Sequence, residues 1–429
     1  MARWFQRSVY QIPRGTRDFV PEEMWKRRFV QRGIEETFRG FGYGEIQTPS
    51  FETLELFTAK SGASIIDELY NFVDKGGREL ALRPELTAPV IRCYIERLQM
   101  APKPLKLFYF GNCFRYDRPQ KGRYREFWQA GCELLGTDSP EAHAELIALA
   151  FTILRHIGLR DIVLNIGNLT VIQAMFERLR VTDAVKKDLL PFIDKSQFED
   201  LFSALRVNDV SPQEAEAFLE MLQTPDLEKI TAYVSRSKQA VAELERLRGV
   251  LTLLKESFGI PDPRVKMGIV RGLDYYKGLV FEIEAPVLGA EKQLCGGGDY
   301  ELVSLFGGTL VPQAGFAIGF DRALLALETE GYAFPEASLD VFVVPVSEAA
   351  MGAALSAATQ LRFQGLSVDL DLVRRGIGKA LKYAAAQHAR FAVIIGPKEL
   401  EDRVVTLRNM TDGSQSTCPV TELAVRIRG

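Results

Sequence analysis

The chain has 429 residues, too many for one small domain, so we expect two or three domains. Its 53 basic and 56 acidic residues give a net charge of −3, which excludes a globally basic nucleic-acid binder and leaves only local patches for such contacts. Five widely spaced cysteines without a CxxC pair argue against a zinc site, and no run of eighteen apolar residues suggests a membrane span. We therefore expect a cytoplasmic protein with reduced thiols, no membrane partner and no protein-bound metal.

The first predicted element is a helix from Glu22 to about Arg39. Trp25, Phe29, Ile34 and Phe38 recur near helical spacing and predict one apolar stripe. An extended segment follows, and Pro49 confines it to a sheet edge or an interface. A long helix that leads into such an edge is a plausible dimer seam.

Residues 69–92 predict a hairpin around 75–77 and then a helix that begins near Ala88. Glu85 and Thr87 stand at the start of this helix. One interpretation is N-terminal capping by Thr87, with Glu85 near the positive helix end. Capping alone does not require the preceding Arg83-Pro84, so the segment is also a candidate wall of a binding site.

An apolar run at 105–110 predicts a buried central strand, and a basic loop follows it. The loop carries five cations in eleven residues: Arg115, Arg118, Lys121, Arg123 and Arg125. These cations repel one another unless an anion is present, and guanidinium groups suit phosphate. The alternative is a solvated basic hairpin tip.

The segment from 126 to 135 alternates as a strand does, with one wholly apolar face formed by Trp128, Ala130, Cys132 and Leu134. The opposite face carries Gln129 and Glu133, and we expect Gly131 to leave open space between them. The amide and the carboxylate would stand about 13 Å apart along the strand. This polar floor directly follows the basic loop, which favours a site over a solvated tip. Phosphates beside a small polar molecule suggest a nucleotide-dependent activating enzyme.

Residues 142–157 predict a helix capped by Ser139-Pro140, and a strand begins near Asp161. Residues 169 to about 258 are charged, helix-forming and nearly free of glycine, and they predict an inserted helical domain with solvated faces. Strands return at 269–285, with Arg271, Asp274, Tyr275 and Tyr276 clustered before a β-rich run, and at the glycine-rich segment 295–308, where close backbone approach is possible.

Residues 314–327 predict a strand that runs into a helix with Arg322 near its start. A cation there opposes the helix dipole, which favours a role in the site, on phosphate or a nucleobase. From residue 340 to 429, alternating strands and helices predict a small, largely parallel α/β domain. The basic side of its second helix, Arg374 to Ala389, is typical of a solvated face.

Six motifs, in order, give the chain its resemblance to a known family: IPRGTRDF, RPELTAP, FRYDRPQKGRYREFWQAGCELLG, RGLDYYKGLVFE, GGGDY and AGFAIGFDRALL. Over essentially its full length the chain resembles the histidyl-tRNA synthetases, which are class II aminoacyl-tRNA synthetases. The resemblance implies an α+β fold: an antiparallel class II sheet flanked by helices, a helical insertion and a C-terminal α/β anticodon-binding domain. The expected boundaries are 1–167 and 260–330 for the catalytic domain, 168–259 for the insertion and 338–429 for the last domain.

The resemblance also implies a reaction and its partners. ATP, with Mg²⁺ as its nucleotide complex, and L-histidine would form histidyl-adenylate, and the histidyl group would pass to tRNA(His) on a homodimer. Arg115 and Arg271 would be catalytic, on the α-phosphate. Histidine would be held by the following residues: Glu85, Leu86, Thr87, Arg115, Gln129, Glu133, Arg271, Tyr275 and Tyr276. ATP would be bound by Arg115, Arg123, Phe127 and Arg322. Arg118 and Gln120 would meet the tRNA acceptor end.

The chain departs from the family pattern in one segment. Many members carry Gly-Gly-Arg-Tyr-Asp where this chain has residues 297–301, so the arginine on which a phosphate role there would rest is replaced by Asp299, while Tyr300 is retained. Two other interpretations stay open. One is a regulatory paralog that binds ATP phosphoribosyltransferase in histidine biosynthesis. The other is a class II synthetase for another amino acid.

Overall fold

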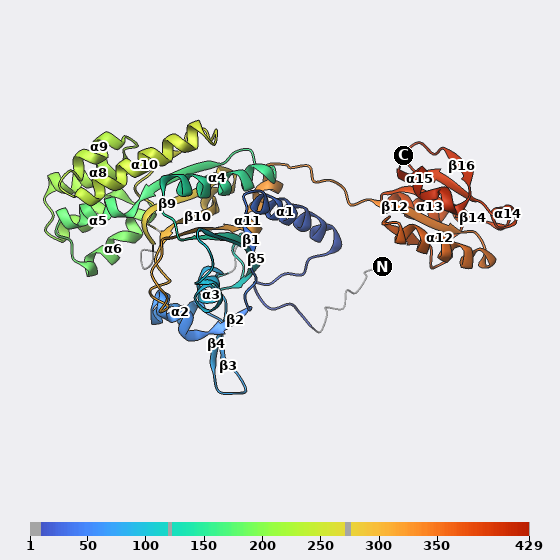
Figure 1. Ribbon diagram of the computed structural model, residues 1–429, viewed down its shortest axis with the longest axis horizontal. Helices are drawn as coiled ribbons and strands as arrows, with labels where there is room; N and C mark the ends of the chain where they lie inside the picture. The colour runs from blue at the N-terminus through green and yellow to red at the C-terminus, as the bar shows by residue number, and fades with distance from the viewer. Residues whose placement is uncertain (1–9, 119–121, 271–275, 429) are drawn as a thin grey trace, which may run out of the picture. The chain divides into compact units, whose positions relative to one another are not determined.

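A computed structural model describes residues 10–118, 122–270 and 276–428 (Figure 1). The chain divides into two compact units, one up to Tyr332 and one from Ala333 onward. Of the predicted site residues, Gln120, Arg271 and Tyr275 lie outside the described residues. None of the described helices is both long enough and apolar enough to cross a membrane.

An eight-stranded sheet forms the centre of the first unit. Its strands, from one edge to the other, are β1 (Gly44–Glu45), β5 (Leu105–Phe114), β6 (Glu126–Leu135), β11 (Gln313–Gly319), β10 (Gln293–Tyr300), β9 (Tyr276–Glu284), β7 (Val163–Asn168) and β8 (Arg264–Val265). The inner pairs are antiparallel, and the outermost pairs, β1–β5 and β7–β8, are parallel. This arrangement confirms the expected antiparallel sheet of an α+β fold.

Glycines let β10 lie unusually close to its two neighbours. A Cβ atom on Gly297 would meet the Gly315 carbonyl oxygen of β11 at 2.4 Å. A Cβ on Gly298, whose φ is +152°, would meet the Leu279 carbonyl oxygen of β9 at 2.3 Å. The glycine-rich segment therefore serves the close backbone approach that its sequence predicts.

Helices α1 (Pro21–Gly40) and α4 (Pro140–His156) pack against each other beside this sheet. The Ser139 hydroxyl caps α4 by accepting from the Ala142 N–H, as the sequence predicts. In α1 the predicted stripe is partly wrong, because the buried residues include Val30, Ile34 and Phe38 whereas Trp25 is 42% exposed.

A small sheet, β2 (Phe51–Thr53), β4 (Glu79–Leu82) and β3 (Asn71–Val73), lies next to α2 (Leu54–Ser61), a 3-10 helix η1 (Ala63–Glu68), α3 (Thr87–Cys93) and a π-helical turn η2 (Tyr94–Leu98). The predicted hairpin is confirmed, since β3 and β4 are antiparallel. The Asp74 carboxylate fixes its turn by accepting from the N–H groups of Gly76 and Arg78.

Six helices lie between β7 and β8, in the segment predicted to be helical. They are α5 (Leu169–Arg178), α6 (Asp183–Asp194), α7 (Phe198–Val207), α8 (Pro212–Gln223), α9 (Leu227–Tyr233) and α10 (Lys238–Glu256). Helix α10 packs against α4 and α5, which joins this segment to the sheet layer (Figure 1). The boundaries 168–259 for a separate insertion domain stay a prediction. The first unit closes with the 3-10 helix η3 (Pro286–Glu291) and α11 (Phe320–Thr329).

The second unit is a five-stranded sheet in the order β13 (Val368–Leu370), β12 (Leu339–Pro345), β14 (Ala389–Ile395), β15 (Val405–Asn409) and β16 (Gln415–Cys418). Its helical elements are η4 (Glu348–Ala350), α12 (Met351–Phe363), α13 (Ile377–Ala386), α14 (Pro397–Asp402), η5 (Val420–Glu422) and α15 (Leu423–Arg428). The pairs around β12 are parallel, as predicted. Strand β16, which the sequence analysis missed, adds an antiparallel edge.

Candidate active site

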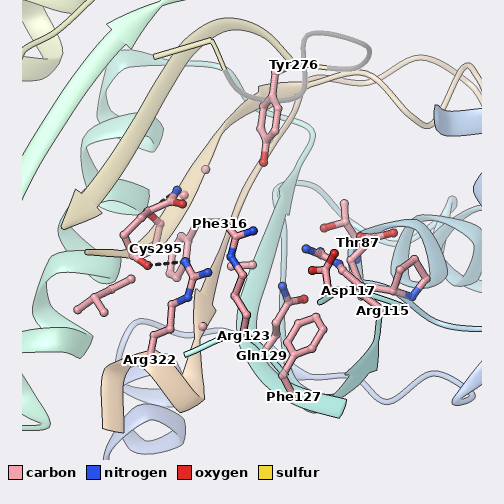
Figure 2. A pocket seen from close by; sticks show the side chains of 18 of the residues that line it. Thr87, Arg115, Asp117, Arg123, Phe127, Gln129, Tyr276, Cys295, Phe316 and Arg322 are labelled. Atoms are coloured by element: carbon pink, nitrogen blue, oxygen red, sulfur yellow. Dashed lines mark hydrogen bonds between the residues drawn. The ribbon is translucent and has the colours of Figure 1, made fainter. Parts of the chain in front are cut away.

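A cavity of about 860 Å³ lies in the first unit and brings most of the predicted site residues together (Figure 2). The predicted residues that line it are Glu85, Thr87, Arg115, Arg123, Phe127, Gln129, Glu133, Tyr276 and Arg322. They come from the start of α3, the loop between β5 and β6, strand β6 itself, the start of β9 and the start of α11. Segments more than two hundred residues apart in the chain therefore meet at one cavity.

The Glu133 carboxyl group lies at the buried end of this cavity and is 1% exposed. Burial raises its pKa to about 8, against hydrogen bonds from Tyr300, Thr87 and Tyr109, which favour the charged form. The Tyr300 hydroxyl donates to one carboxyl oxygen at 2.5 Å, and the Tyr109 hydroxyl donates to the other at 3.0 Å. At neutral pH this raised pKa favours the protonated form of Glu133, which is held between two tyrosines.

The space above Gly131 is not open, and that expectation is wrong. A Cβ on Gly131 would meet the Tyr109 hydroxyl at 2.6 Å and the Phe316 carbonyl oxygen at 2.5 Å. Tyr109 lies on β5 directly opposite Gly131, so its ring crosses the glycine and reaches Glu133. The glycine makes room for a tyrosine of the same protein and not for a ligand.

Gln129 and Tyr276 also line the cavity, away from this buried end. The Gln129 side-chain oxygen accepts from the Cys113 thiol, with a sulfur–oxygen distance of 3.4 Å. The Tyr276 ring packs edge-on against Tyr300, with the ring centroids 6.5 Å apart. Figure 2 shows Tyr276 reaching from the start of β9 into the cavity.

Glu85 caps α3, which corrects one detail of the sequence interpretation. Its carboxylate accepts from the Thr87 N–H at 2.7 Å and from the Ala88 N–H at 3.2 Å. The capping group is therefore Glu85 rather than Thr87. The Thr87 side chain instead hydrogen-bonds with Glu133, so the segment both caps a helix and forms a wall of the cavity.

Three predicted arginines line the cavity: Arg123 and Arg322 lie near each other, and Arg115 lies apart from them beside Thr87 (Figure 2). The Arg115 Nε donates to the Pro84 carbonyl oxygen at 3.0 Å, and its guanidinium lies 5.2 Å from the centre of the Phe127 ring. Arg123 and Arg322 share one partner, since both donate to Glu291 Oε2, at 3.1 Å and 2.7 Å (Figure 2 shows the two arginines). A carboxylate thus stands where two guanidinium groups converge.

Arg322 is the third residue of α11, and its guanidinium also donates to the carbonyl oxygens of Gly122 and Gln293. Its neighbour Asp321 is buried and joins three elements. The Asp321 carboxylate accepts from Arg17 at 2.8 Å, from Arg27 at 2.7 Å and from the Trp128 N–H at 2.8 Å. This ion-pair cluster fixes the start of α11 against β6, and with it the position of Arg322.

Two predicted residues lie elsewhere. Leu86 is buried in an apolar cluster with Val90 and Tyr109 and does not line the cavity. Arg118 is exposed and also lies outside the lining. Among residues 10–118, 122–270 and 276–428, no group of three or more His, Cys, Asp or Glu side chains is placed to hold a metal ion.

Sequence analysis did not assign Tyr109, Tyr300 or Glu291 to the site. Tyr300 had a signal, since it is the retained tyrosine of the glycine-rich segment. Tyr109 lies within an apolar run, and only its pairing opposite Gly131 reveals its role. Glu291 had no signal, because its partners Arg123 and Arg322 lie far away in the sequence.

Comparisons with known proteins agree with this geometry. The sequence profile described as "Histidyl-tRNA synthetase" matches residues 15–323, and one described as "Anticodon binding domain" matches residues 340–429. The protein named histidine–tRNA ligase from Methanosarcina acetivorans is 43% identical over 97% of this chain and 98% of its own length. The one from Archaeoglobus fulgidus is 41% identical over 96% and 98%.

Solved structures extend the similarity to the fold. The apo histidyl-tRNA synthetase of S. aureus superposes with a TM-score of 0.73 at 30% identity, over 98% of this chain and 100% of that one. The histidyl-tRNA synthetase from Nostoc sp. PCC 7120 gives a TM-score of 0.83 at 25% identity, over 98% and 99%. With its profile match, full-length relatives and cavity lined by the expected side chains, the chain belongs to the histidyl-tRNA synthetase family.

Proposed function

We propose that this protein is a histidine–tRNA ligase, which activates L-histidine with ATP and transfers the histidyl group to the 3′ end of tRNA(His). The observation that carries the proposal is that one cavity holds both a buried Glu133 between two tyrosines and a pair of arginines, Arg123 and Arg322, that converge on Glu291. A small polar substrate fits the first end and a polyphosphate fits the second.

Histidine would bind with its imidazole toward Glu133 and its polar backbone groups toward Glu85, Gln129 and Arg115. A carboxyl group is a suitable partner for an imidazole, because it can accept from one ring N–H or share a proton with the ring. Tyr275 and Arg271, outside the described residues, would complete this end by the family's pattern, with Tyr276 beside them. Leu86 would act only through the packing of the α3 start, since it is absent from the lining.

The phosphate end would bind ATP as its Mg²⁺ complex. Arg123 and Arg322 would exchange their shared partner Glu291 for phosphate oxygens, and Phe127 would pack on the nucleotide. The histidine carboxylate oxygen would attack the α-phosphorus and form a new P–O bond, while the bond to the leaving pyrophosphate breaks. No general base is required, since the attacking carboxylate is already ionised.

Arg115 and Arg271 would stabilise the charge that develops on the α-phosphate, as fixed cations do in electrostatic catalysis. For Arg115 the hydrogen bond to the Pro84 carbonyl and the contact with Phe127 support this role, because they hold the side chain before substrate arrives. Replacing Arg271 with alanine should abolish adenylate formation while the fold is kept. Near-normal pyrophosphate exchange in that variant would contradict its assignment.

tRNA would contact both units. Arg118, exposed at the base of the basic loop, and Gln120 would meet the acceptor end. Residues 340–429 match the anticodon-binding profile and would read the other end of the tRNA. The helical segment α5–α10 would form the insertion domain between the two parts of the catalytic domain. The free cysteines of the chain support a reducing, cytoplasmic location.

A homodimer is the proposed assembly. The small sheet that follows Pro49 exposes Phe51 of β2 and Phe72 of β3, whose rings pack edge-on across β4 with their centroids 6.5 Å apart. An exposed pair of aromatic side chains on the face of a small sheet favours an interface. Light scattering of the purified protein should give twice the chain mass of 48.1 kDa, and a monomer at micromolar concentration would contradict the proposal.

The test of the proposed function is amino-acid-dependent ATP–pyrophosphate exchange with all twenty amino acids and Mg²⁺. We expect exchange with histidine alone, followed by charging of tRNA(His). Exchange with another amino acid would identify a different class II synthetase. Silence with every amino acid would favour the regulatory paralog, which the anticodon-domain match and the full-length relatives already disfavour.

A further inference from the structure

Asp299 is the residue at which the chain departs from the family pattern. Its carboxylate contacts His143 of helix α4. It stands next to the end of β10, just after an irregularity in the pairing of β10 with β9 between residues 298 and 299. One carboxylate oxygen accepts from the Leu279 N–H at 3.0 Å, and the other hydrogen-bonds to the His143 Nε2 of α4. Asp299 therefore joins two strands and a helix.

His143 is 1% exposed and lies between two oxygen acceptors. Its Nδ1 is 2.9 Å from the Ser139 carbonyl oxygen, and its Nε2 faces Asp299. Burial and the positive charge of Arg246 act against a charge on this ring, but the hydrogen bond and charge of Asp299 and the Ser139 carbonyl outweigh them, so the pKa of His143 is raised above its usual value. The ring Nε2–H can donate to the Asp299 carboxylate, whereas Nδ1 can either donate to the Ser139 carbonyl oxygen or accept from Arg246, but not both at once.

Arg246 connects this pair to the helical segment. It lies on α10, with a terminal nitrogen 3.1 Å from His143 Nδ1, and it donates to the Asp138 carbonyl oxygen. Its neighbour Glu243 accepts from the Asn168 side chain at 3.0 Å. Asp299, His143 and Arg246, which we name the Asp299 network, thus run from the end of β10 to the helical segment.

The other neighbour of Asp299 is Tyr300, and this step connects the network to the cavity. The Tyr300 hydroxyl donates to Glu133, and the Tyr300 ring packs against Tyr276. A shift of the strand end at Asp299 would move this hydroxyl, because the two residues share a peptide bond. Displacements well under 1 Å are enough to weaken a buried hydrogen bond of this kind.

We propose that the Asp299 network is a positioning device for the amino-acid end of the cavity. The Asp299–His143 pair fixes the end of β10 so that Tyr300 meets Glu133, and Arg246 makes this setting depend on the helical segment. The proposal rests on the proposed function, in that Glu133 is taken to face the histidine side chain. It gives the residue that departs from the family pattern a role in substrate affinity rather than in phosphate binding.

The central test is Asp299→Asn, which keeps the shape and removes the charge. We expect KM for histidine in ATP–pyrophosphate exchange to rise about tenfold while KM for ATP stays within twofold. Glu301→Gln is the matched control, since Glu301 flanks Tyr300 on its other side and pairs outward with Lys277 and Ser304. A merely structural role would lower the fraction of active enzyme and leave KM for histidine unchanged, and that result would overturn the proposal.

A double-mutant cycle separates the pair from independent damage. If Asp299 acts through His143, His143→Gln combined with Asp299→Asn should raise KM for histidine no further than Asp299→Asn alone. Strictly additive effects would contradict coupling. Circular dichroism and the unfolding temperature establish that each variant is folded.

Of the three variants, Arg246→Ala should disturb folding least, because it removes a partly exposed side chain of α10. We expect a two- to threefold rise in KM for histidine, with Arg248→Ala on the same helix as the control. An unchanged KM would remove the helical segment from the network. If the unaltered protein itself shows no histidine-dependent exchange, the proposed function fails, and this outcome is distinct from a failure of the Asp299 network.

Discussion

The side chains at the two ends of the cavity differ in charge: Arg123 and Arg322 are charged at one end, and Glu133 is favoured in its neutral form at the other. At the arginine end, Arg123 has a side chain that is 48% exposed, and its charge is balanced by Glu291. At the other end, Glu133 is buried, and the environment removes its charge, because its pKa is raised to about 8. Arg123 stays charged and accessible to a polyphosphate. Glu133 is favoured in its neutral form, and a substrate that pairs with the carboxylate would favour the charged form. We therefore expect the loss of a catalytic arginine to lower the rate and the loss of the Glu133 carboxyl group to lower the affinity for histidine.

The largest effect should come from Arg115→Ala, which removes a fixed cation from the site where the α-phosphate would react. We expect kcat of ATP–pyrophosphate exchange to fall about 10²- to 10³-fold, as when one preorganised donor to a transition-state oxyanion is removed, or about 3 to 4 kcal/mol. The unfolding free energy should change little. Arg28→Ala, on the exposed side of α1, is the control. A pure rise in KM for histidine with normal kcat would place Arg115 in ground-state binding instead.

Glu133→Gln should remove the titratable group from the amino-acid end of the cavity, because glutamine resembles the protonated acid but cannot become charged. KM for histidine should rise at least tenfold, since an amide cannot take up the charged form. The protein should stay folded, because the raised pKa of Glu133 already favours a neutral group at this position. Isothermal calorimetry of histidine binding measures the first effect. Unchanged affinity would contradict the assignment of the imidazole to Glu133.

The same residue predicts a pH dependence of stability in the unaltered protein. The folded-state pKa of Glu133 is raised to about 8 from an ordinary value near 4.5, so the folded state holds a proton that the unfolded state has lost. Stability from this group is complete below pH 4.5 and is lost as pH rises through 8, by about 4 to 5 kcal/mol in total. Urea unfolding between pH 5 and 9 should show this decline, and Glu133→Gln should flatten it.

Gly131→Ala tests whether the close contact of Tyr109 with Gly131 leaves room for a side chain at position 131. The new methyl group would overlap Tyr109 and the Phe316 carbonyl oxygen, and overpacking of this kind costs about 1 to 3 kcal/mol of stability. Gly40→Ala, where a Cβ meets nothing within 4 Å, is the control. Chemical denaturation gives both values. An equal effect in the two variants would show that Tyr109 moves aside at no cost.

The smallest effect should follow Glu291→Gln. This change removes the carboxylate shared by Arg123 and Arg322, so KM for ATP should fall about two- to threefold. The change is small because pairs with an exposed partner contribute little in water. Exchange rates over a range of ATP concentrations give the value. A higher KM would mean that Glu291 orients the arginines for the nucleotide.

Sequence reasoning worked where a feature is carried by neighbours in the chain. The alternation of residues 126–135 predicted β6, and Ser139 predicted the start of α4, because strand faces and helix caps are local. The family motifs then predicted nine of the residues that line the cavity. The prediction for Trp25 failed because the position of α1 against α4 decides which side of the helix is buried.

The remaining features of the site depend on long-range contacts. Gly131 appears as open space in the sequence, but the partner strand β5 places Tyr109 over it. The protonation of Glu133 depends on burial by several strands together, and no pattern within β6 predicts it. Glu85 and Thr87 were placed correctly in the wall, yet which of them caps α3 was decided by side-chain direction.

The neutral form of Glu133, which its raised pKa favours, also affects how the two substrates arrive. Exposed arginines project a field that reaches about one Debye length, about 8 Å at physiological ionic strength, so association of ATP should slow as salt is added. A protonated, buried carboxyl group projects almost none, so it cannot draw an imidazole from a distance. Selection of the side chain at Glu133 would thus take place after encounter, in how slowly the bound amino acid leaves.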